Sequence, residues 1–290
     1  MSSKNSMAPM ISVIIPTHNR ALTIKRAIDS VLIQRKHYPS LEILVVDDAS
    51  SDETGELLAS LMERCDCLTV LRVSSASPLG VSHARNLGIK KAQGEWLAFL
   101  DSDDEWQKRK LERLMLFVSE HPALRAFHSN EVWVRNGLRV NQMKKHQKYG
   151  GQIFDKCLSM CRISPSASLI HKEVFKTIGF FREDFIVCED YDFWLRMALY
   201  FEVGYLDLPL IIKYGGHEDQ LSRRFVAMDY WRIKSMVLLY KEHGERLSFV
   251  QKVLVREEIA RKAEHLLLGY KKHNNLEKLR EVELMLTELS

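Results

Sequence analysis

Short apolar runs alternate with amphipathic segments through the first hundred residues, and this alternation is the feature that most constrains the fold. Short runs rich in β-branched side chains are typical of buried strands. We identify four of them, at residues 11–15, 42–46, 68–73 and 96–100. Between them, apolar residues recur at helical spacing over residues 24–32, 54–62 and 84–92. The pattern predicts an α/β protein with a doubly wound, mostly parallel sheet flanked by helices.

The second part of the chain is less regular. Helical spacing over residues 108–118 and 191–200 predicts two helices, and residues 167–170 read as a strand. From about residue 228 to the end, Leu, Val and Ile recur at helical spacing among balanced charges. This predicts a C-terminal helical extension.

Composition and charge exclude several classes of protein. With 46% hydrophobic and 28% charged residues, the 290-residue chain has globular rather than disordered or fibrous usage. Its net charge of +4 is small for a nucleic-acid-binding protein. We expect its five cysteines to be free thiols in a reducing compartment. Because no apolar run approaches the ~20 residues that span a bilayer, we expect a cytoplasmic protein, soluble or peripheral to a membrane.

Polar clusters follow three of the predicted strands at the point where each strand ends. The clusters are His18-Asn19, Asp47-Asp48 and residues 101–104 (DSDD). In an open α/β sheet, ligands bind beyond the carboxyl ends of the strands. We therefore expect the three clusters to converge on one binding site.

The cluster at residues 101–104 contains three carboxylates, which repel one another unless a cation or hydrogen-bond donors compensate their charge. Oxygen ligands on a short turn suit a hard divalent cation, Mg²⁺ or Mn²⁺, that bridges the protein to a diphosphate. Two structural interpretations compete with this one. The cluster can be a solvated acidic turn, or Asp103 and Asp104 can cap the helix predicted near residue 108.

Asp48 stands at the end of the second predicted strand, where a carboxylate can accept a hydrogen bond from an imide N–H such as a uracil ring presents. His18, after the first strand, would lie over the same base. The residues that follow Asp48 need no ligand to explain them, because Ser51 or Asp52 suits the N-cap of the next helix.

Six motifs together resemble the pattern of family 2 glycosyltransferases, in that family's order and at about its spacing, over roughly residues 10–225. The motifs are Val13 to Arg20, Val45 to Thr54, Gly80 with Ala84-Arg85-Asn86, Gly94-Glu95 leading to Phe99 to Asp104, Gly179-Phe180-Phe181, and Glu189 to Arg196. Each motif is weak by itself, whereas six in order are specific. One departure is His18, where family members often carry Tyr; this keeps a flat ring but weakens the hydrogen bond expected from a phenol.

The resemblance implies a GT-A fold and a nucleotide-sugar donor, with uridine as the default base. Residues 10–105 would form the nucleotide-sugar-binding half, residues 106–225 the acceptor-binding half, and residues 226–290 the helical extension. The residues implied in donor binding are Pro16, Thr17, His18, Arg20, Asp48, Arg85, Asp101, Ser102 and Asp103. The residues implied in holding the Mg²⁺ or Mn²⁺ cofactor are Asp103, Asp104 and His217.

By the same resemblance, Glu189 and Asp190 provide the base of an inverting transfer. A carboxylate within hydrogen-bond reach can take the proton of the acceptor hydroxyl. At the start of a helix, the helix dipole favours Asp190 in its ionised form, and Glu189 would orient it or bind the acceptor. The structural alternative is that Asp190 is only the N-cap of that helix.

The resemblance points to a glycan or a lipid-linked acceptor. Aromatic candidates for stacking on the acceptor are Phe180, Phe181, Trp106 and Trp194. From residue 135 to residue 148 there are five Lys or Arg and no acidic residue, which indicates a solvated face or a docking site for an anionic acceptor or lipid head groups. The apolar faces of the C-terminal helices would pack on the domain or on a second subunit.

Two other functions stay open on the sequence. A metal-dependent nucleotidyltransferase also uses carboxylates on an α/β sheet, but it would carry a glycine-rich phosphate loop after the first strand, and residues 16–20 contain no glycine. A non-catalytic nucleotide- or glycan-binding module would have lost the acidic pair or the base, and both positions are filled.

Overall fold

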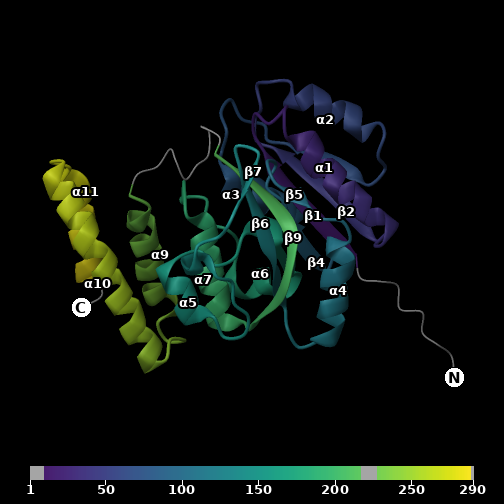
Figure 1. The fold of residues 1–290 in the computed structure, drawn as a ribbon. Helices are drawn as coiled ribbons and strands as arrows, with labels where there is room; N and C mark the ends of the chain where they lie inside the picture. Colours follow the sequence, from purple (N-terminus) through teal and green to yellow (C-terminus); the bar gives the residue numbers. More distant parts are fainter. Residues whose placement is uncertain (1–9, 217–226, 289–290) are drawn as a thin grey trace.

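The computed structural model describes residues 10–216 and 227–288. Its sheet has the strand order β3-β2-β1-β4-β8-β6-β9-β5, with β7 paired to β6 (Figure 1). The strands are β1 Ile11–Thr17, β2 Leu41–Asp47, β3 Leu68–Arg72, β4 Trp96–Phe99, β5 Glu105–Trp106, β6 Ala126–Arg135, β7 Leu138–Val140, β8 Ser168–His171 and β9 Val203–Gly215.

The N-terminal half of the sheet is parallel and doubly wound, as the sequence predicts. β1 pairs in parallel with β2 and β4, and β2 pairs in parallel with β3. The connecting helices are α1 Ile24–Leu32, α2 Thr54–Met62 and α3 Val81–Lys91. Alternate residues of β1 belong to different apolar clusters: Val13 packs with α1, and Ile14 packs with Ile89 of α3. This burial on both faces explains why the strand is apolar without interruption.

The C-terminal half of the sheet is mixed and supplies the antiparallel pairs of an otherwise parallel sheet. β8 is antiparallel to β4 and β6, and β5 is antiparallel to β9, whereas β6 and β9 are parallel. β6 turns directly into β7 through Asn136 and Gly137, both at positive φ (49° and 76°). A two-residue turn of this kind joins antiparallel strands, and the Asn-Gly pair is its sequence signal.

The remaining helices include those predicted at residues 108–118, at 191–200 and from about 228 onward, and also two further ones, at residues 154–159 and 172–178. They are α4 Lys110–Glu120, α5 Phe154–Ser159, α6 Lys172–Ile178, α7 Glu189–Tyr200, α9 Met228–His243, α10 Phe249–Lys272 and α11 Leu276–Thr287. Short 3₁₀ helices are η1 Ile33–Lys36, η2 Lys144–His146 and η3 Pro165–Ala167. The predicted strand at residues 167–170 is β8, and the chain after residue 228 is helical as expected.

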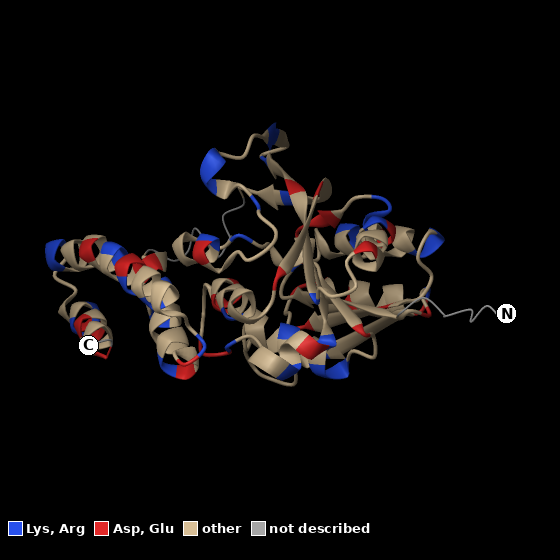
Figure 2. Ribbon diagram, turned by 90° about the horizontal axis from the view of Figure 1, so that it is seen from below, with Lys and Arg blue, Asp and Glu red and all other residues tan. Residues whose placement is uncertain are grey.

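The C-terminal helices stack against the side of the molecule that α7 forms, away from α1 and α2 (Figure 1). Ile233 and Met236 of α9 and Val255 of α10 belong to the same buried apolar cluster as Trp194 of α7. Both Lys or Arg and Asp or Glu occur along the length of these helices (Figure 2). Within the described ranges, no helix is both long enough and apolar enough to cross a bilayer.

Candidate active site

The ends of β1 and β2 meet, as the strand-end argument predicts. The His18 ring donates from Nδ1 to the carbonyl oxygen of Asp48 at 2.7 Å. The Asp48 carboxylate in turn accepts from the backbone N–H groups of Leu79 (2.9 Å) and Gly80 (2.7 Å). Asp48 is only 3% exposed, so in this structure it fixes the loop that leads into α3.

The turn after β4 is held by a serine from the other half of the chain. The Asp104 N–H donates to the carbonyl oxygen of Asp101 at 3.0 Å, which closes the turn. Ser166 accepts from the Asp101 N–H at 3.1 Å and donates to Asp104 Oδ2 at 2.6 Å. Arg26 of α1 donates to the carbonyl oxygen of Asp103 at 2.6 Å. Asp104 is 2% exposed, whereas Asp101 and Asp103 are partly exposed.

Arg85 joins this turn to helix α7. Its guanidinium is buried, and it donates to Asp101 Oδ1 at 2.8 Å and to Glu189 Oε1 at 2.7 Å. A planar guanidinium can make both contacts at once because its donors point in fixed, diverging directions. Residues from α3, the turn after β4 and the start of α7 therefore form one site.

The carboxyl groups of the acidic turn are hard to ionise together. Burial and the neighbouring Asp101 raise the pKa of Asp103, and burial raises the pKa of Asp104 well above its ordinary value. Carboxyl groups that resist ionisation together gain most from a divalent cation, which favours their charged form. All donors in the turn are oxygen atoms, which suits Mg²⁺ or Mn²⁺.

Two charged residues that the sequence analysis did not single out lie close to the site: Lys213 interacts electrostatically with the turn, and Glu131 interacts with Lys213. Lys213 of β9 is partly exposed, and although burial opposes its charge, Asp104 and Glu131 raise its pKa above the ordinary value. Glu131 forms a buried ion pair with Lys148 at 3.1 Å, and despite burial its pKa is lowered to about 2. Lys148 is thus one basic residue of the 135–148 stretch that has a structural role.

Asp190 is placed at the first turn of α7, beside Glu189. Its Oδ1 accepts from the Tyr191 N–H at 2.7 Å, and its Oδ2 lies 3.3 Å from Cys161 Sγ. Asp190 is partly exposed, whereas Glu189 is buried. Burial and the Asp190 charge raise the pKa of Glu189 to about 7, against the opposing effect of Arg85. The exposed member of the pair is therefore the one that can reach a ligand.

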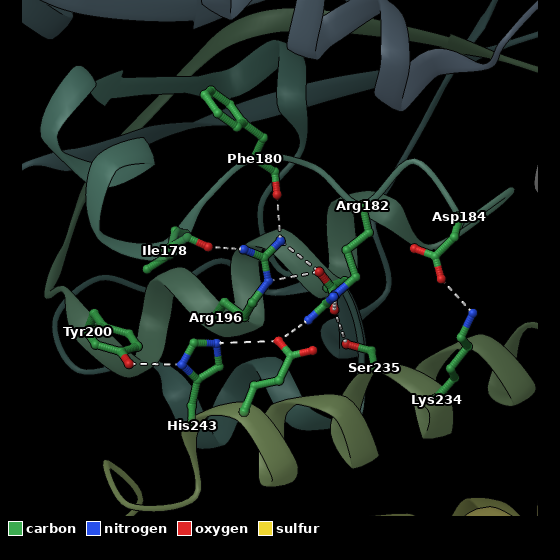
Figure 3. Close-up of polar contacts among 11 residues, drawn as sticks. Ile178, Phe180, Arg182, Asp184, Arg196, Tyr200, Lys234, Ser235 and His243 are labelled. Carbon is green, nitrogen blue, oxygen red and sulfur yellow. Dashed lines mark hydrogen bonds and ion pairs between the residues drawn. The ribbon is translucent and has the colours of Figure 1, made fainter.

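A buried polar network connects helix α7 to the 178–184 segment and to α9 (Figure 3). Arg196 donates to Asp192 from Nε (2.9 Å) and Nη2 (2.8 Å), and to the carbonyl oxygens of Ile178 and Phe180. Asp192 also accepts from Ser235 of α9 at 3.1 Å and from Arg182 at 3.2 Å. These contacts hold the helix that carries Asp190 in place.

Three of the four aromatic residues predicted to stack on the acceptor are buried, so that prediction is wrong for them. Trp106 and Phe181 are 2% exposed and Trp194 is 1% exposed, so their rings offer no surface for a sugar. Trp106 Nε1 donates to the Ser166 carbonyl oxygen, and Phe181 stacks on Phe193 with ring centroids 4.3 Å apart. Their roles are in the core. Phe180 is 39% exposed and lies over the Lys90 ammonium at 5.6 Å.

The other residues predicted for donor binding differ in how far their side chains are exposed. His18 and Arg20 are partly exposed, and Pro16, Thr17 and Ser102 are buried at the same sheet edge. His217 lies outside the described residues. Among the described residues, one group of metal-ligating side chains has its ligand atoms within 4.8 Å of one another, Cys65-Asp66-Cys67. Asp66 is paired with Arg35 at 2.8 Å, which does not favour a cation there.

Comparison with known proteins identifies the family. Residues 12–179 match the family described as glycosyl transferase family 2. The chain belongs to that family. A protein of Rickettsia felis, named an uncharacterized glycosyltransferase, is 32% identical over 200 residues, which are 69% of this chain and 32% of the relative. The chain therefore spans about a third of the length of that relative.

A second relative has a more specific name. The Escherichia coli protein WfgD, named UDP-Glc:alpha-D-GlcNAc-diphosphoundecaprenol beta-1,3-glucosyltransferase, is 31% identical over 188 residues. The match covers 65% of this chain and 69% of WfgD.

Solved structures of similar fold confirm the expected GT-A architecture. TarS residues 1–349 of S. aureus, in complex with UDP-GlcNAc, superpose with a TM-score of 0.68 at 20% identity, over 94% of this chain and 90% of that TarS fragment. The mannosyltransferase PcManGT of Pyrobaculum calidifontis, in complex with GDP-Man and Mn²⁺, gives a TM-score of 0.62 at 16% identity, over 98% and 86% of the two chains.

Proposed function

We propose that this chain is an inverting glycosyltransferase that moves a sugar from a UDP-sugar to a hydroxyl of a glycan or lipid-linked acceptor. The observation that carries the proposal is the Arg85 bridge, which brings Asp101 of the acidic turn and Glu189 of the base-bearing helix into one site. The UDP donor is supported by the UDP-Glc in the name of WfgD and by the UDP-GlcNAc in the TarS complex. The lipid-linked acceptor is supported by WfgD alone, and it would bring the protein to the cytoplasmic face of a membrane.

On this proposal, Asp103 and Asp104 hold a divalent cation, Mg²⁺ or Mn²⁺. The fit rests on their oxygen-only donors and on the raised pKa of both carboxyl groups. When bound, such a cation neutralises charge on the leaving nucleoside diphosphate. His18 and Asp48 lie at the neighbouring strand ends and are proposed to border the base.

Asp190 is proposed as the general base. It takes the proton of the acceptor hydroxyl while that oxygen forms a bond to the anomeric carbon. The bond from the anomeric carbon to the diphosphate breaks on the opposite side, and its electron pair leaves with the diphosphate. The product therefore has the opposite anomeric configuration. Glu189, held by Arg85, orients the helix end that carries the base.

The proposal is tested by Asp190→Asn, with a panel of nucleotide sugars and both donor hydrolysis and sugar transfer as readouts. We expect the variant to lose transfer by about 10³-fold, because removing a general base has effects of this order. The Kd for UDP in the presence of Mn²⁺ should stay within about threefold of the wild type, because Asp190 is separate from the acidic turn. The matched control is Asp184→Asn, an exposed carboxylate on the preceding loop that pairs with Lys234.

Three outcomes would contradict the proposal or a part of it. Full turnover in Asp190→Asn would remove the base assignment. A wild-type protein that binds no nucleoside diphosphate with or without Mn²⁺, or that releases pyrophosphate from a nucleoside triphosphate and a sugar phosphate, would remove the glycosyltransferase proposal and favour the binding module or the nucleotidyltransferase.

A further inference from the structure

A cysteine contacts the proposed base. Cys161 lies between α5 and η3, and its Sγ is 3.3 Å from Asp190 Oδ2 and 3.1 Å from the carbonyl oxygen of Ile163. The other carboxylate oxygen of Asp190 accepts from the Tyr191 N–H at 2.7 Å. Each oxygen of the carboxylate therefore has a hydrogen-bond partner, and among the described residues the thiol is the side chain that donates to it.

The sulfur of Cys161 keeps its proton in this environment. Burial raises the pKa of its thiol well above the ordinary value, and the Asp190 charge raises it further. A protonated thiol is a donor, and its single proton has two acceptors within reach. An ionised carboxylate is a stronger acceptor than a peptide carbonyl, so the contact with Asp190 is favoured while Asp190 is charged.

The segment that carries Cys161 is tied to two helices. Tyr191 of α7 donates from its hydroxyl to the Leu158 carbonyl oxygen at 2.7 Å. Lys262 of α10 is buried and donates to the Ser159 carbonyl oxygen at 3.1 Å. Lys262 is itself paired with Asp229 of α9 at 3.0 Å. Cys161 thus faces Asp190 from a backbone that α7 and the C-terminal helices both hold.

We propose that Cys161 is a positioning residue, whose thiol holds the Asp190 carboxylate in the orientation that accepts the proton of the acceptor hydroxyl. This inference rests on the proposed function, in which Asp190 is the general base. A thiol suits this role because it is a weak donor. A strong donor such as an ammonium would favour the charged carboxylate so much that it would lower the basicity that the reaction needs.

The test compares Cys161→Ala with Cys161→Ser in kcat, in acceptor KM and in the pH dependence of kcat/KM at saturating donor. Loss of the thiol donor in Cys161→Ala should lower kcat about 3- to 10-fold, the range expected for one weak hydrogen bond. The acid limb of the profile should move to higher pH, because a carboxylate that loses a donor is harder to ionise. Cys161→Ser keeps a donor and should recover most of the wild-type kcat and the wild-type limb.

The matched control is Cys157→Ala, which removes a buried thiol four residues earlier from the apolar core. It should leave kcat and the acid limb near the wild type. Cys161→Val, which lacks the donor but fills the space, replaces the alanine variant if that variant does not fold. Thermal unfolding of every variant shows whether a loss of kcat comes from lost stability instead.

The outcomes separate this inference from the proposed function. If Cys161→Ala keeps the wild-type kcat and acid limb while Asp190→Asn is inactive, Cys161 has no positioning role and the proposed function stands. A different result would make the role of Cys161 structural and the inference wrong. In that case kcat falls in Cys161→Ala, the acid limb of the kcat/KM profile does not move, and Cys161→Ser does not restore kcat. A wild-type protein that neither hydrolyses nor transfers any nucleotide sugar refutes the proposed function first.

Discussion

Arg85 shows how much of the site depends on single side chains. Its guanidinium reaches Asp101 and Glu189, which stand on different elements, and the partner on α7 is 104 residues away in sequence. The sequence motif predicts that Arg85 belongs to the donor site. Its second partner, Glu189, is decided only by the packing of α7 beside α3.

Arg85→Lys should therefore damage the site despite keeping the charge. A lysine ammonium is a point charge and does not bridge two carboxylates in fixed directions as a guanidinium does. We expect kcat/KM for transfer to fall by about 100-fold, equivalent to about 2.7 kcal/mol of transition-state stabilisation. The measurement is steady-state kinetics beside Arg113→Lys, an exposed arginine of α4. Equal activity in the two variants would mean that the bridge does not matter for catalysis.

His128 is a second residue with a consequence for stability. It is fully buried, its Nε2 lies 2.8 Å from the Tyr149 carbonyl oxygen, and burial lowers its pKa to about 4. The unfolded chain takes up the proton near pH 6.5, so stability is present above that pH and is lost as pH falls toward 4.

The loss attributable to His128 should reach up to about 3 kcal/mol at pH 4. His128→Gln does not titrate, and its amide can donate to the same carbonyl oxygen. Denaturant unfolding at several pH values should show a shallower decline for the variant between pH 6.5 and pH 4. If the free energy of unfolding declines equally in both proteins between pH 6.5 and pH 4, His128 does not titrate as its burial implies.

At the scale of elements, helix α7 carries the proposed base at its first turn and an anchoring ion pair in its middle. The motif from Glu189 to Arg196 reads as one unit in the sequence. In the structure its beginning faces the site, while the ion pair of Asp192 and Arg196 is buried, with side chains 1% and 4% exposed. The periodicity predicts the helix, but which charged residues face inward depends on α9 and the 178–184 loop.

Arg196→Met should lower the free energy of unfolding by about 3–5 kcal/mol, because it leaves the buried Asp192 carboxylate without its main partner. The comparison is Arg261→Met, which removes an exposed arginine from an i,i+3 pair with Glu258 and should cost less than about 1 kcal/mol. Urea unfolding of the two variants measures the difference. Similar midpoints would show that Arg182 and Ser235 suffice to hold Asp192.

The turn between α3 and β4 packs directly on β1. A Cβ atom at Gly94 would lie 2.6 Å from the backbone nitrogen of Ser12, and backbone in a central strand cannot move aside cheaply. Gly94→Ala should therefore destabilise the protein by about 1–3 kcal/mol. Gly269→Ala in α10 is the control with the opposite sign, because a Cβ there meets nothing within 4 Å and alanine favours a helix by about 1 kcal/mol. Thermal unfolding distinguishes the two directions.

At the scale of the whole molecule, the C-terminal helices complete the core on the α7 side. The sequence divides the chain near residue 226, and that division stays a prediction. Because α9 and α10 share a buried cluster with α7, we expect the chain to unfold in one transition rather than two.

Deletion of residues 228–290 should therefore leave a chain that aggregates, because it would expose the apolar surface of α7 and α5 that α9 and α10 cover. Soluble expression and circular dichroism of the truncated chain provide the measurement, with the full chain as the reference. A soluble, cooperatively folding truncated chain would establish residues 10–225 as an independent domain.

The sequence by itself determined the parallel half of the sheet and the polar clusters at its strand ends. Both features are local, because each strand and each polar cluster occupies about ten consecutive residues or fewer. A strand that is buried on both faces must be apolar without interruption, which makes it recognisable in the sequence. The mixed half was not predicted, although Asn136-Gly137 marks the β6–β7 turn. Only the tertiary structure placed Cys161 against Asp190 and buried the rings of Trp106 and Trp194. The reason is physical: such contacts depend on how segments far apart in sequence pack, and no local pattern specifies that packing.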